Sequence, residues 1–354
     1  MSSVTEQQVS DYLSRRLGTP LKINKMRQTF PGLSRETLIV FTETGSGEKQ
    51  DFAVRLDYPW GGSCPHPMRH EWETYSRLWG SQVPVAEPLW YDEGIEFAEG
   101  RPHMVRRLVD GSMTVPGLAE DSEAGRQLRQ RVAFECAEKL ALVHTVDWKA
   151  LGFDGFMTVP DDPVDALRAE LRLWRKRWDA GRPGPFPVIE EALCWLEETL
   201  PRETPRLSLT KGNNGLGEEI FRGEKIVAMS DWELSTLSDG VIDLAFSQGT
   251  LTLADFGQTL RHYENCVGSK VSPERLAGGA FVTWFKMIVC AVVHMAKNEL
   301  DGTDDRITNL SFGLIVGKGV EQRLGHCIGR NLVDAWSSLV SDEQSSYFRA
   351  EKSK

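Results

Sequence analysis

The polar residues between Leu209 and Phe246 have the types and spacing of a cation-binding catalytic loop. The segment reads LTKGNNGLGEEIFRGEKIVAMSDWELSTLSDGVIDLAF, in which a predicted strand runs directly into Asp231. A carboxylate at a strand end is well placed to hold Mg²⁺ in a cleft, although an isolated aspartate would more simply cap the next turn. The upstream run KGNNGLG favours the cation site, because Gly- and Asn-rich loops bring backbone close to ligands.

The elements around this segment divide the chain into a β-rich part and a helical part. A helix is predicted over 4–17 and another over 67–80, among short strand-like runs at 21–30, 37–44, 51–58, 88–97 and 101–109. Long amphipathic helices follow, at 124–146, 163–180, 186–200 and from about 242 to 340, interrupted by a β-rich island at 206–232. We therefore predict an α+β fold with a β-sheet lobe, residues 1–108, and a mostly helical lobe, residues 109–354. Ligands commonly bind at such a junction.

Composition argues against several classes of partner. The 354 residues carry a net charge of -10 without a Lys/Arg-rich run, which disfavours nucleic acid and anionic membranes. Six scattered cysteines and an N-terminus unlike a signal peptide lead us to expect a cytoplasmic protein with reduced thiols. The most apolar run, GGAFVTWFKMIVCAVVHMA, is interrupted by Lys286 and His294 and predicts a buried helix. The sequence does not indicate the oligomeric state.

Seven motifs, in order along almost the whole chain, resemble those of the aminoglycoside phosphotransferase family within the protein-kinase-like two-lobed fold. The resemblance is closest to the branch that includes hydroxyacyl-CoA kinases associated with acyl-CoA dehydrogenases. The motifs are FPGLSRETLIVF, FAVRLDYP, HEWETYSRLW, PVAEPLWYDEG, PHMVRRLVDG, KLALVHTVDW and SDWELSTLSDGVIDLA. This resemblance implies that ATP and Mg²⁺ are the cofactors.

The resemblance also implies roles for residues of the β-rich lobe. Gly32 and Ser34 would cover the β- and γ-phosphates. Arg55 would hold phosphate where most kinases carry a lysine, and Glu71 would orient it, the alternative being a surface ion pair. Leu108 would line the adenine site at the hinge between the lobes.

In the helical lobe the resemblance assigns Mg²⁺ binding to Asp231. Asp243, in the first turn of the next helix, would brace the backbone of the catalytic loop. Without the resemblance, capping that helix explains Asp243 equally well.

The catalytic loop departs from the family pattern His-Gly-Asp-x-x-x-x-Asn. Counting back from Asp231 without a gap, its three polar positions are Lys211, Asn213 and Glu218. Asn213 cannot act as a general base, whose loss typically costs about 10²–10⁴-fold, but it could still orient an acceptor hydroxyl. Glu218 would bind Mg²⁺ better than an amide does. Lys211 could neutralise this acid, contact a phosphate or pair with an anionic acceptor.

Three functions are open on this sequence. The first is an ATP- and Mg²⁺-dependent kinase of a small-molecule hydroxyl, with a rearranged catalytic loop. The second is a nucleotide-binding protein or scaffold that has lost transfer chemistry. The third is an enzyme of another class that reuses the fold, with Glu218 or Glu219 as its base.

Two helical segments, 167–187 and 278–300, would wall the acceptor site. The first is rich in arginine and tryptophan, which suits an anionic or CoA-linked acceptor better than a polycationic aminoglycoside. A solvated amphipathic helix with its tryptophans in the core explains the same pattern. The residues concerned are Arg168, Arg172, Trp174, Arg175, Lys176, Arg177 and Trp178.

Overall fold

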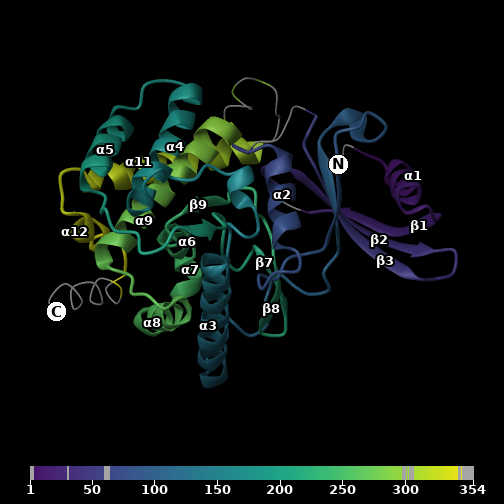
Figure 1. Ribbon diagram of the computed structural model, residues 1–354, viewed down its shortest axis with the longest axis horizontal. Helices are drawn as coiled ribbons and strands as arrows, with labels where there is room; N and C mark the ends of the chain where they lie inside the picture. The colour runs from purple at the N-terminus through teal and green to yellow at the C-terminus, as the bar shows by residue number, and fades with distance from the viewer. Residues whose placement is uncertain are drawn as a thin grey trace.

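The computed structural model consists of a β-sheet lobe and a larger helical lobe (Figure 1). It describes residues 4–29, 32–59, 64–296 and 307–341, together with the single residues 300, 302 and 344. The start of the motif FPGLSRETLIVF and most of the polar C-terminal tail lie outside these residues. The α+β fold predicted from the sequence is confirmed.

The smaller lobe is built on one antiparallel sheet with strand order β1-β2-β3-β5-β4. Helix α1 packs on one end of the sheet, and helix α2 lies beside β4 and β5. The register of β3 places Arg55 opposite Thr37 on β2 and Met104 on β5. The elements are α1 (Glu6–Leu17), β1 (Leu21–Gln28), β2 (Glu36–Thr44), β3 (Lys49–Leu56), α2 (Met68–Leu78), β4 (Pro88–Asp92) and β5 (His103–Arg107).

Local signals in the sequence define the ends of α1. Thr5 caps its N-terminus in a reciprocal capping box with Gln8, and Gly18 ends it in the left-handed conformation, with φ of 66°. Val9, Tyr12 and Leu13 lie on its buried face, at helical spacing. The predicted helix over 4–17 is therefore found within two residues of its expected limits.

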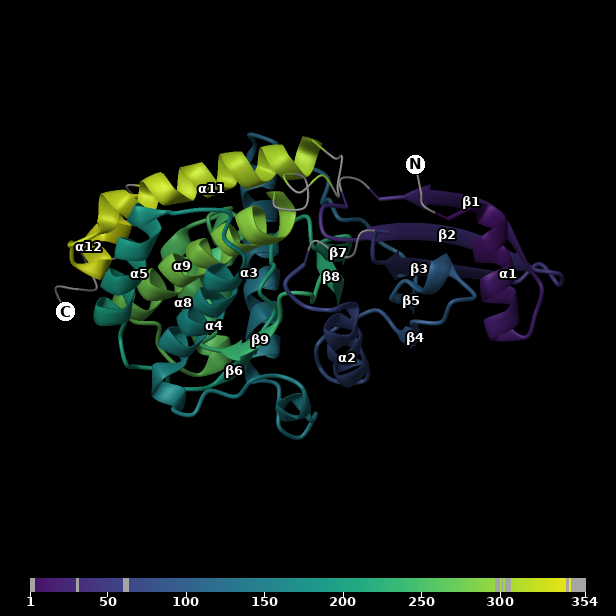
Figure 2. The same ribbon diagram turned by 90° about the horizontal axis from the view of Figure 1, so that it is seen from above.

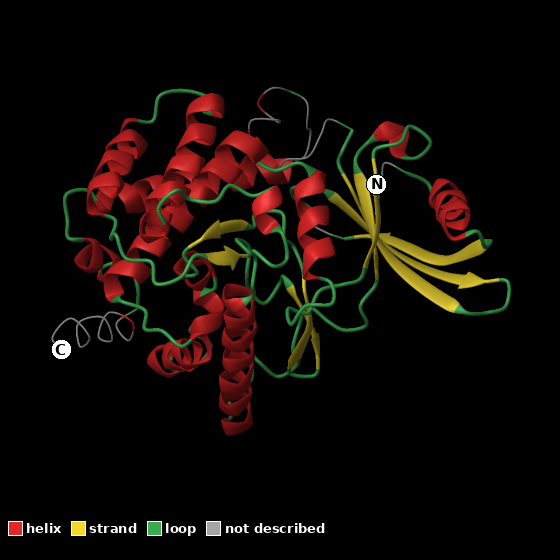
Figure 3. Ribbon diagram, in the orientation of Figure 1, coloured by secondary structure: helices red, strands yellow, loops and turns green. Residues whose placement is uncertain are grey.

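The larger lobe surrounds two short β-ribbons with helices (Figure 3). Its helices are α3 (Glu123–Thr145), α4 (Ala166–Gly181), α5 (Pro187–Thr199), α6 (Val241–Phe246), α7 (Gln248–Leu251), α8 (Phe256–Val267), α9 (Pro273–Ile288), α11 (Ile307–Cys327) and α12 (Leu332–Ser337). The ribbons pair β6 (Ser208–Thr210) with β9 (Thr236–Ser238), and β7 (Glu219–Arg222) with β8 (Lys225–Met229). Helix α11 runs along one side of this lobe toward the sheet lobe (Figure 2), where Asn309 donates a 3.2 Å hydrogen bond to the Leu33 carbonyl.

The apolar helix α9 lies in the core of the helical lobe. It continues into a π-helical turn, Val289–Ala296, and packs against α4, α6, α11 and α12. The whole run Pro273–Ala296 is long and apolar enough to cross a membrane, yet 89% of its most apolar window is buried inside the protein. The buried helix expected here is found.

Helix α4 corrects the expectation of a basic and aromatic acceptor wall. Trp174 and Trp178 are both 0% exposed and face the core. On the outside of the helix, Arg172 pairs with Asp165 and Arg175 pairs with Glu190. The alternative, a solvated amphipathic helix, is correct: the tryptophans bury apolar surface, and Arg172 and Arg175 pair with nearby carboxylates.

Truncating a core tryptophan of α4 tests this orientation. We expect Trp178→Ala to lower the free energy of unfolding by about 3–5 kcal/mol, because it leaves a large cavity. Arg172→Ala, on the exposed side of the same helix, should change it by no more than about 0.5 kcal/mol. Urea denaturation followed by far-UV circular dichroism measures both; equal effects would contradict the orientation.

Candidate active site

A cavity of about 1090 Å³ lies where the two lobes meet. Gly32, Ser34 and Arg55 line it from the sheet lobe, and Leu108 lines it at the hinge. Asn213, Glu218 and Asp231 line it from the helical lobe, together with a wall formed by Phe246, Lys286, Met287, Cys290, Met295 and Phe312. The cavity thus gathers most of the site residues expected from the sequence. Its helical wall comes from α6, α9, the π-helical turn and α11, and not from α4.

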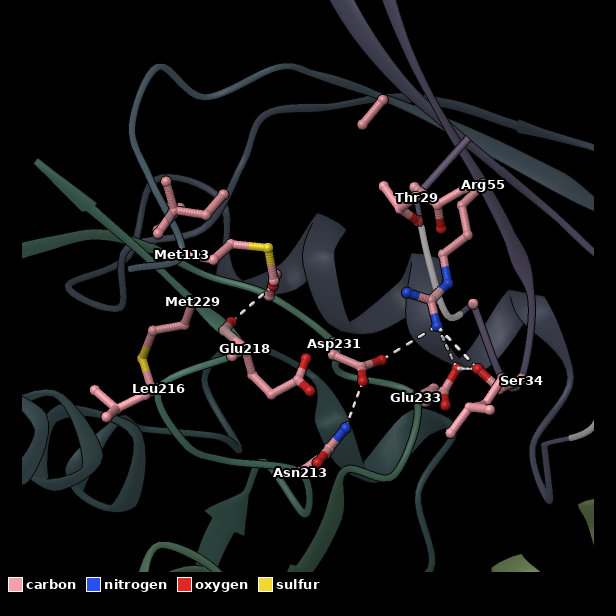
Figure 4. A pocket seen from close by; sticks show the side chains of 18 of the residues that line it. Thr29, Ser34, Arg55, Met113, Asn213, Leu216, Glu218, Met229, Asp231 and Glu233 are labelled. Atoms are coloured by element: carbon pink, nitrogen blue, oxygen red, sulfur yellow. Dashed lines mark hydrogen bonds and ion pairs between the residues drawn. The ribbon is translucent and has the colours of Figure 1, made fainter. Parts of the chain in front are cut away.

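Arg55 lies at the centre of a buried ionic cluster (Figure 4). Its Nε is 3.1 Å from Glu71 Oε2, and its Nη2 is 3.2 Å from Asp231 Oδ1. Glu71 is 0% exposed, so the alternative of a surface ion pair is wrong. Burial raises the pKa of Glu71 even though Arg55 opposes the shift.

Glu233 connects the lobes and was given no role by the sequence. Its carboxylate accepts hydrogen bonds from Ser34 Oγ at 2.9 Å, from Arg35 Nη1 at 3.0 Å and from Arg55. Arg35 also pairs with Asp57 at 2.8 Å. Both residues could have been predicted from the sequence, because Glu233 ends the Asp-Trp-Glu triplet and Arg35 follows Ser34 directly.

Counted by its ion pairs, this cluster contains more carboxylates than guanidiniums, and Arg106 and Lys211 act on Glu71 and Asp231 from further away. The two guanidiniums of Arg35 and Arg55 face four carboxylates, those of Asp57, Glu71, Asp231 and Glu233. An uncompensated excess of buried negative charge is costly, and a divalent cation would offset it.

The donor set also fits Mg²⁺. No group of three or more His, Cys, Asp or Glu side chains that could hold a metal occurs among the described residues. Mg²⁺ does not require one, since it uses one or two protein carboxylates and completes its shell with phosphate oxygens and water. Asp231 and Glu218 can supply those carboxylates.

Asp231 adopts a strained backbone conformation, and its carboxylate lies near the side chains of Asn213 and Glu218. Its φ of 63° is uncommon for a residue with a side chain. Asn213 Nδ2 donates to Asp231 Oδ2, and Glu218 lies beside Asp231 in the same cavity (Figure 4). Burial, helped by the Asp231 charge, raises the pKa of Glu218 to about 7. Asp231 itself stays ionised: burial opposes this, but Arg55 and Lys211 hold its pKa below the ordinary value.

Asp243 holds the catalytic loop from beneath. Its Oδ2 accepts the Lys211 N–H at 2.6 Å and its Oδ1 accepts the Gly212 N–H at 2.8 Å, while His144 Nε2 lies 3.0 Å from Oδ2. Gly212 is required, since its φ is +80° and a Cβ there would come within 2.3 Å of the Leu234 carbonyl oxygen. The alternative of a helix cap is wrong, because the N-cap of α6 is Gly240, with no side-chain cap hydrogen bond.

Lys211 supports the loop and does not reach the cavity. It is 0% exposed, its Nζ lies 3.4 Å from Glu219 Oε1, and it also donates to the Asn213 carbonyl. Burial raises the pKa of Glu219 to about 8, with Lys211 opposing the shift. The expectation that Lys211 contacts a phosphate or the acceptor does not hold; it is a positioning residue.

Comparison with solved structures identifies the fold. A Ralstonia eutropha protein assigned to the aminoglycoside phosphotransferases aligns with a TM-score of 0.65 and 20% identity, covering 91% of this chain and 97% of that one. An aminoglycoside phosphotransferase in complex with ADP and hygromycin B aligns at 0.58 and 16% identity, over 90% and 98% of the two chains. A type I macrolide 2'-phosphotransferase aligns at 0.58 and 18% identity, over 90% and 99%. The chain has the protein-kinase-like fold of these phosphotransferases.

Sequence comparison finds similarity to members of the acyl-CoA dehydrogenase family. Acyl-CoA dehydrogenase family member 11 of Gallus gallus is 25% identical over 250 residues, which are 63% of this chain and 30% of that protein. Family member 10 of Mus musculus is 29% identical over 188 residues, 51% of this chain and 16% of that protein. No protein-family model matches the chain. The resemblance inferred from the motifs is confirmed, and this chain corresponds to less than a third of the length of these relatives.

Neutralising Asp243 tests the brace beneath the loop. The hydrogen bonds from His144 and from the loop amides outweigh burial and lower the pKa of Asp243. Its ionised form therefore stabilises the fold above the ordinary carboxyl pKa of about 3.9, and this contribution is lost as the pH falls through the lower folded-state value. We expect Asp243→Asn to cost about 1.5–3 kcal/mol at neutral pH, with the difference from the parent protein shrinking once the pH falls below about 4 and vanishing only below the lowered folded-state pKa.

Urea denaturation over a pH series measures this difference. The exposed Asp154→Asn is the matched control and should change stability by no more than about 0.5 kcal/mol. A cost for Asp243→Asn that does not depend on pH would show that the carboxylate charge is not what holds the loop.

Proposed function

We propose that this chain is an ATP- and Mg²⁺-dependent phosphotransferase that acts on a hydroxyl group of a small molecule. The observation that carries the proposal is the arrangement around Arg55. One cation, the loop amide of Asn213 and the carboxylates of Asp231 and Glu218 meet in one cavity between the lobes. Structures of an aminoglycoside phosphotransferase of the same fold, in complex with ADP or with the ATP analogue AMP-PNP, support the choice of nucleotide.

In this proposal the sheet lobe binds the nucleotide. Leu108 contacts the adenine at the hinge, while Gly32 and Ser34 cover the phosphates. Arg55 is held by Glu71 and can bind phosphate oxygens with two parallel N–H groups. Bound Mg²⁺ would neutralise charge on the transferred phosphate, held by Asp231 and Glu218.

Asn213 positions the acceptor and does not remove its proton. Its amide nitrogen already donates to Asp231, which leaves the amide oxygen to accept a hydrogen bond from the acceptor hydroxyl. Phosphoryl transfer depends chiefly on positioning and charge stabilisation, so an amide can support it at a reduced rate. The missing base also makes a nucleotide-binding scaffold the second candidate function.

An acid-base enzyme of another class has less support. Glu219 points beneath the loop to Lys211 and is 4% exposed, so it cannot reach a substrate in the cavity. Glu218 faces the cavity, but beside Asp231 and Asn213, where a phosphotransferase would hold its metal.

The lining of the cavity supports an acceptor with an apolar body. The wall formed by α6, α9, the π-helical turn and α11 contributes Met287, Cys290 and Phe312, and among its described lining residues Lys286 is the one charged side chain. A polycationic aminoglycoside would need carboxylates there. Since the sequence relatives are acyl-CoA dehydrogenase family members, we propose an acyl or CoA-linked hydroxyl compound as acceptor.

Nucleotide binding can be tested by thermal shift. ATP or ADP with Mg²⁺ should stabilise the parent protein, by about 2.7 kcal/mol at a hundredfold excess over the dissociation constant. Asp231→Ala should abolish the dependence on Mg²⁺, and Glu218→Gln should weaken it, whereas the exposed Asp154→Asn should behave as the parent. Lack of any nucleotide effect in the parent would sink the proposal; an unchanged response in Glu218→Gln would remove the metal role of Glu218 alone.

Restoring the family residue tests catalysis. Asn213→Asp should raise Mg²⁺-dependent ADP formation with hydroxy acids and their CoA thioesters, within the range of about 10²–10⁴-fold that general-base catalysis supplies. Asn213→Ala should lower it, because the positioning amide is lost. If Asn213→Asp reduces turnover instead, the asparagine belongs to a different working arrangement.

A further inference from the structure

A second, smaller cavity lies behind the metal-binding loop. It has a volume of about 220 Å³ and shares no lining residue with the main cavity, as far as the described residues show. The loop after Asp231 separates the two: Glu233 and Leu234 line the main cavity, whereas Ser235 and the two residues after it line the second. The opposite walls are His66 and His70, at the start of α2, and residues of α4.

Arg177 of α4 is the charged group of this cavity. It stacks on Trp174, with its guanidinium carbon 4.5 Å from the ring centre, and its Nη2 lies 3.0 Å from His66 Nε2. Its Nη1 is buried and has no hydrogen-bond partner. No ion pair to a carboxylate is found for Arg177 among the described residues, unlike its neighbours Arg172 and Arg175.

The two histidines do not supply a counter-charge or a second cation. Because Arg177 can only donate, the nitrogen of His66 that faces it must accept, and the ring is therefore neutral. Burial and the neighbouring His70 and Arg177 lower the pKa of His66. Burial lowers the pKa of His70 to about 4, and its Nε2 contacts the Ser235 carbonyl at 2.9 Å.

Glu170, the carboxylate in the lining, is already satisfied. It accepts hydrogen bonds from Trp174 Nε1 at 2.8 Å and from Thr236 Oγ1 at 3.2 Å, and Lys286 Nζ lies 3.9 Å away. The remaining walls are largely apolar, with Phe156, Met157, Ala169, Leu173 and Leu237. The cavity thus contains one partly exposed cation, Arg177, whose buried Nη1 is an unused donor next to an apolar space.

We propose that this second cavity binds a small organic carboxylate, whose carboxyl group pairs with Arg177 and whose apolar body fills the space beside it. A buried N–H without a partner is costly, and a planar carboxylate is the group that guanidinium binds best. Exposed Thr158 lies at the rim, so a ligand can enter from solvent. The site is separate from the proposed phosphotransferase chemistry and does not depend on it.

A ligand here would contact the active-site loop from the side opposite the nucleotide. Ser235 and His70 are hydrogen-bonded across the cavity wall, and the next residue, Glu71, holds Arg55. Such a ligand would fix α2 against the loop that carries Asp231 and Glu233. It would act as an effector and not as an acceptor.

Ligand-observed NMR with butyrate and its neutral analogue butyramide tests the site in the whole chain. Butyrate should bind saturably, with a dissociation constant on the order of 1 mM for so small a ligand, and butyramide should not. Mg²⁺ with ATP should leave butyrate bound, because the two cavities are separate. Arg177→Gln should weaken binding at least about tenfold, whereas Lys176→Gln, the same charge change on the exposed neighbour, should not.

A second variant guards against a folding defect in Arg177→Gln. Ala169→Met keeps the arginine but fills the cavity, and it should also abolish binding. The proposal is overturned if butyrate does not bind, if it binds Arg177→Gln as tightly as the parent, or if ATP displaces it. Binding of inorganic phosphate in place of butyrate would equally overturn the assignment to a carboxylate. None of these readouts requires turnover, so a failure here is distinct from a failure of the phosphotransferase proposal.

Discussion

The rest of the structure depends on the salt-bridged contact between Glu233 and the cations of the sheet lobe. Ser34, Arg35 and Arg55 come from one lobe, and the carboxylate that binds them comes from the other. Removing one partner of such a buried pair typically costs about 3–5 kcal/mol, because the other charge is left uncompensated. The contact therefore sets how the lobes meet, and a nucleotide in the cleft must share these cations with Glu233.

The loop that carries Asn213 and Glu218 is held from beneath by buried charges. Asp243 binds two loop amides, and Lys211 and Glu219 form a buried pair beneath the loop. The side chains of Asn213 and Glu218 can then differ from the family pattern while the loop backbone keeps its conformation. The loop offers an amide at Asn213 and an acid at Glu218 to the cavity, on a backbone held by Asp243.

Much of the fold could be predicted because its signals are local. The capping box at Thr5, the left-handed Gly18 and the spacing of apolar residues define α1 from a dozen consecutive residues. Strand β8, which ends two residues before Asp231, and the motif order were equally predictable. The face of α4 was not, because arginine and tryptophan suit both a ligand wall and a solvated helix until the neighbouring helices are in place.

The sequence by itself determined the two-lobed fold, the family resemblance and the membership of most of the site, including Arg55, Glu71 and Asp231. Only the tertiary structure decided which charges meet. Arg35, Glu233 and the unsatisfied Arg177 are ordinary polar residues in the sequence, and Lys211 looked like a ligand-binding cation. Burial gives each its role, together with pairing that for Arg35, Glu233 and Arg177 joins segments more than a hundred residues apart, since the energy of a charge depends on what surrounds it and not on its position in the chain.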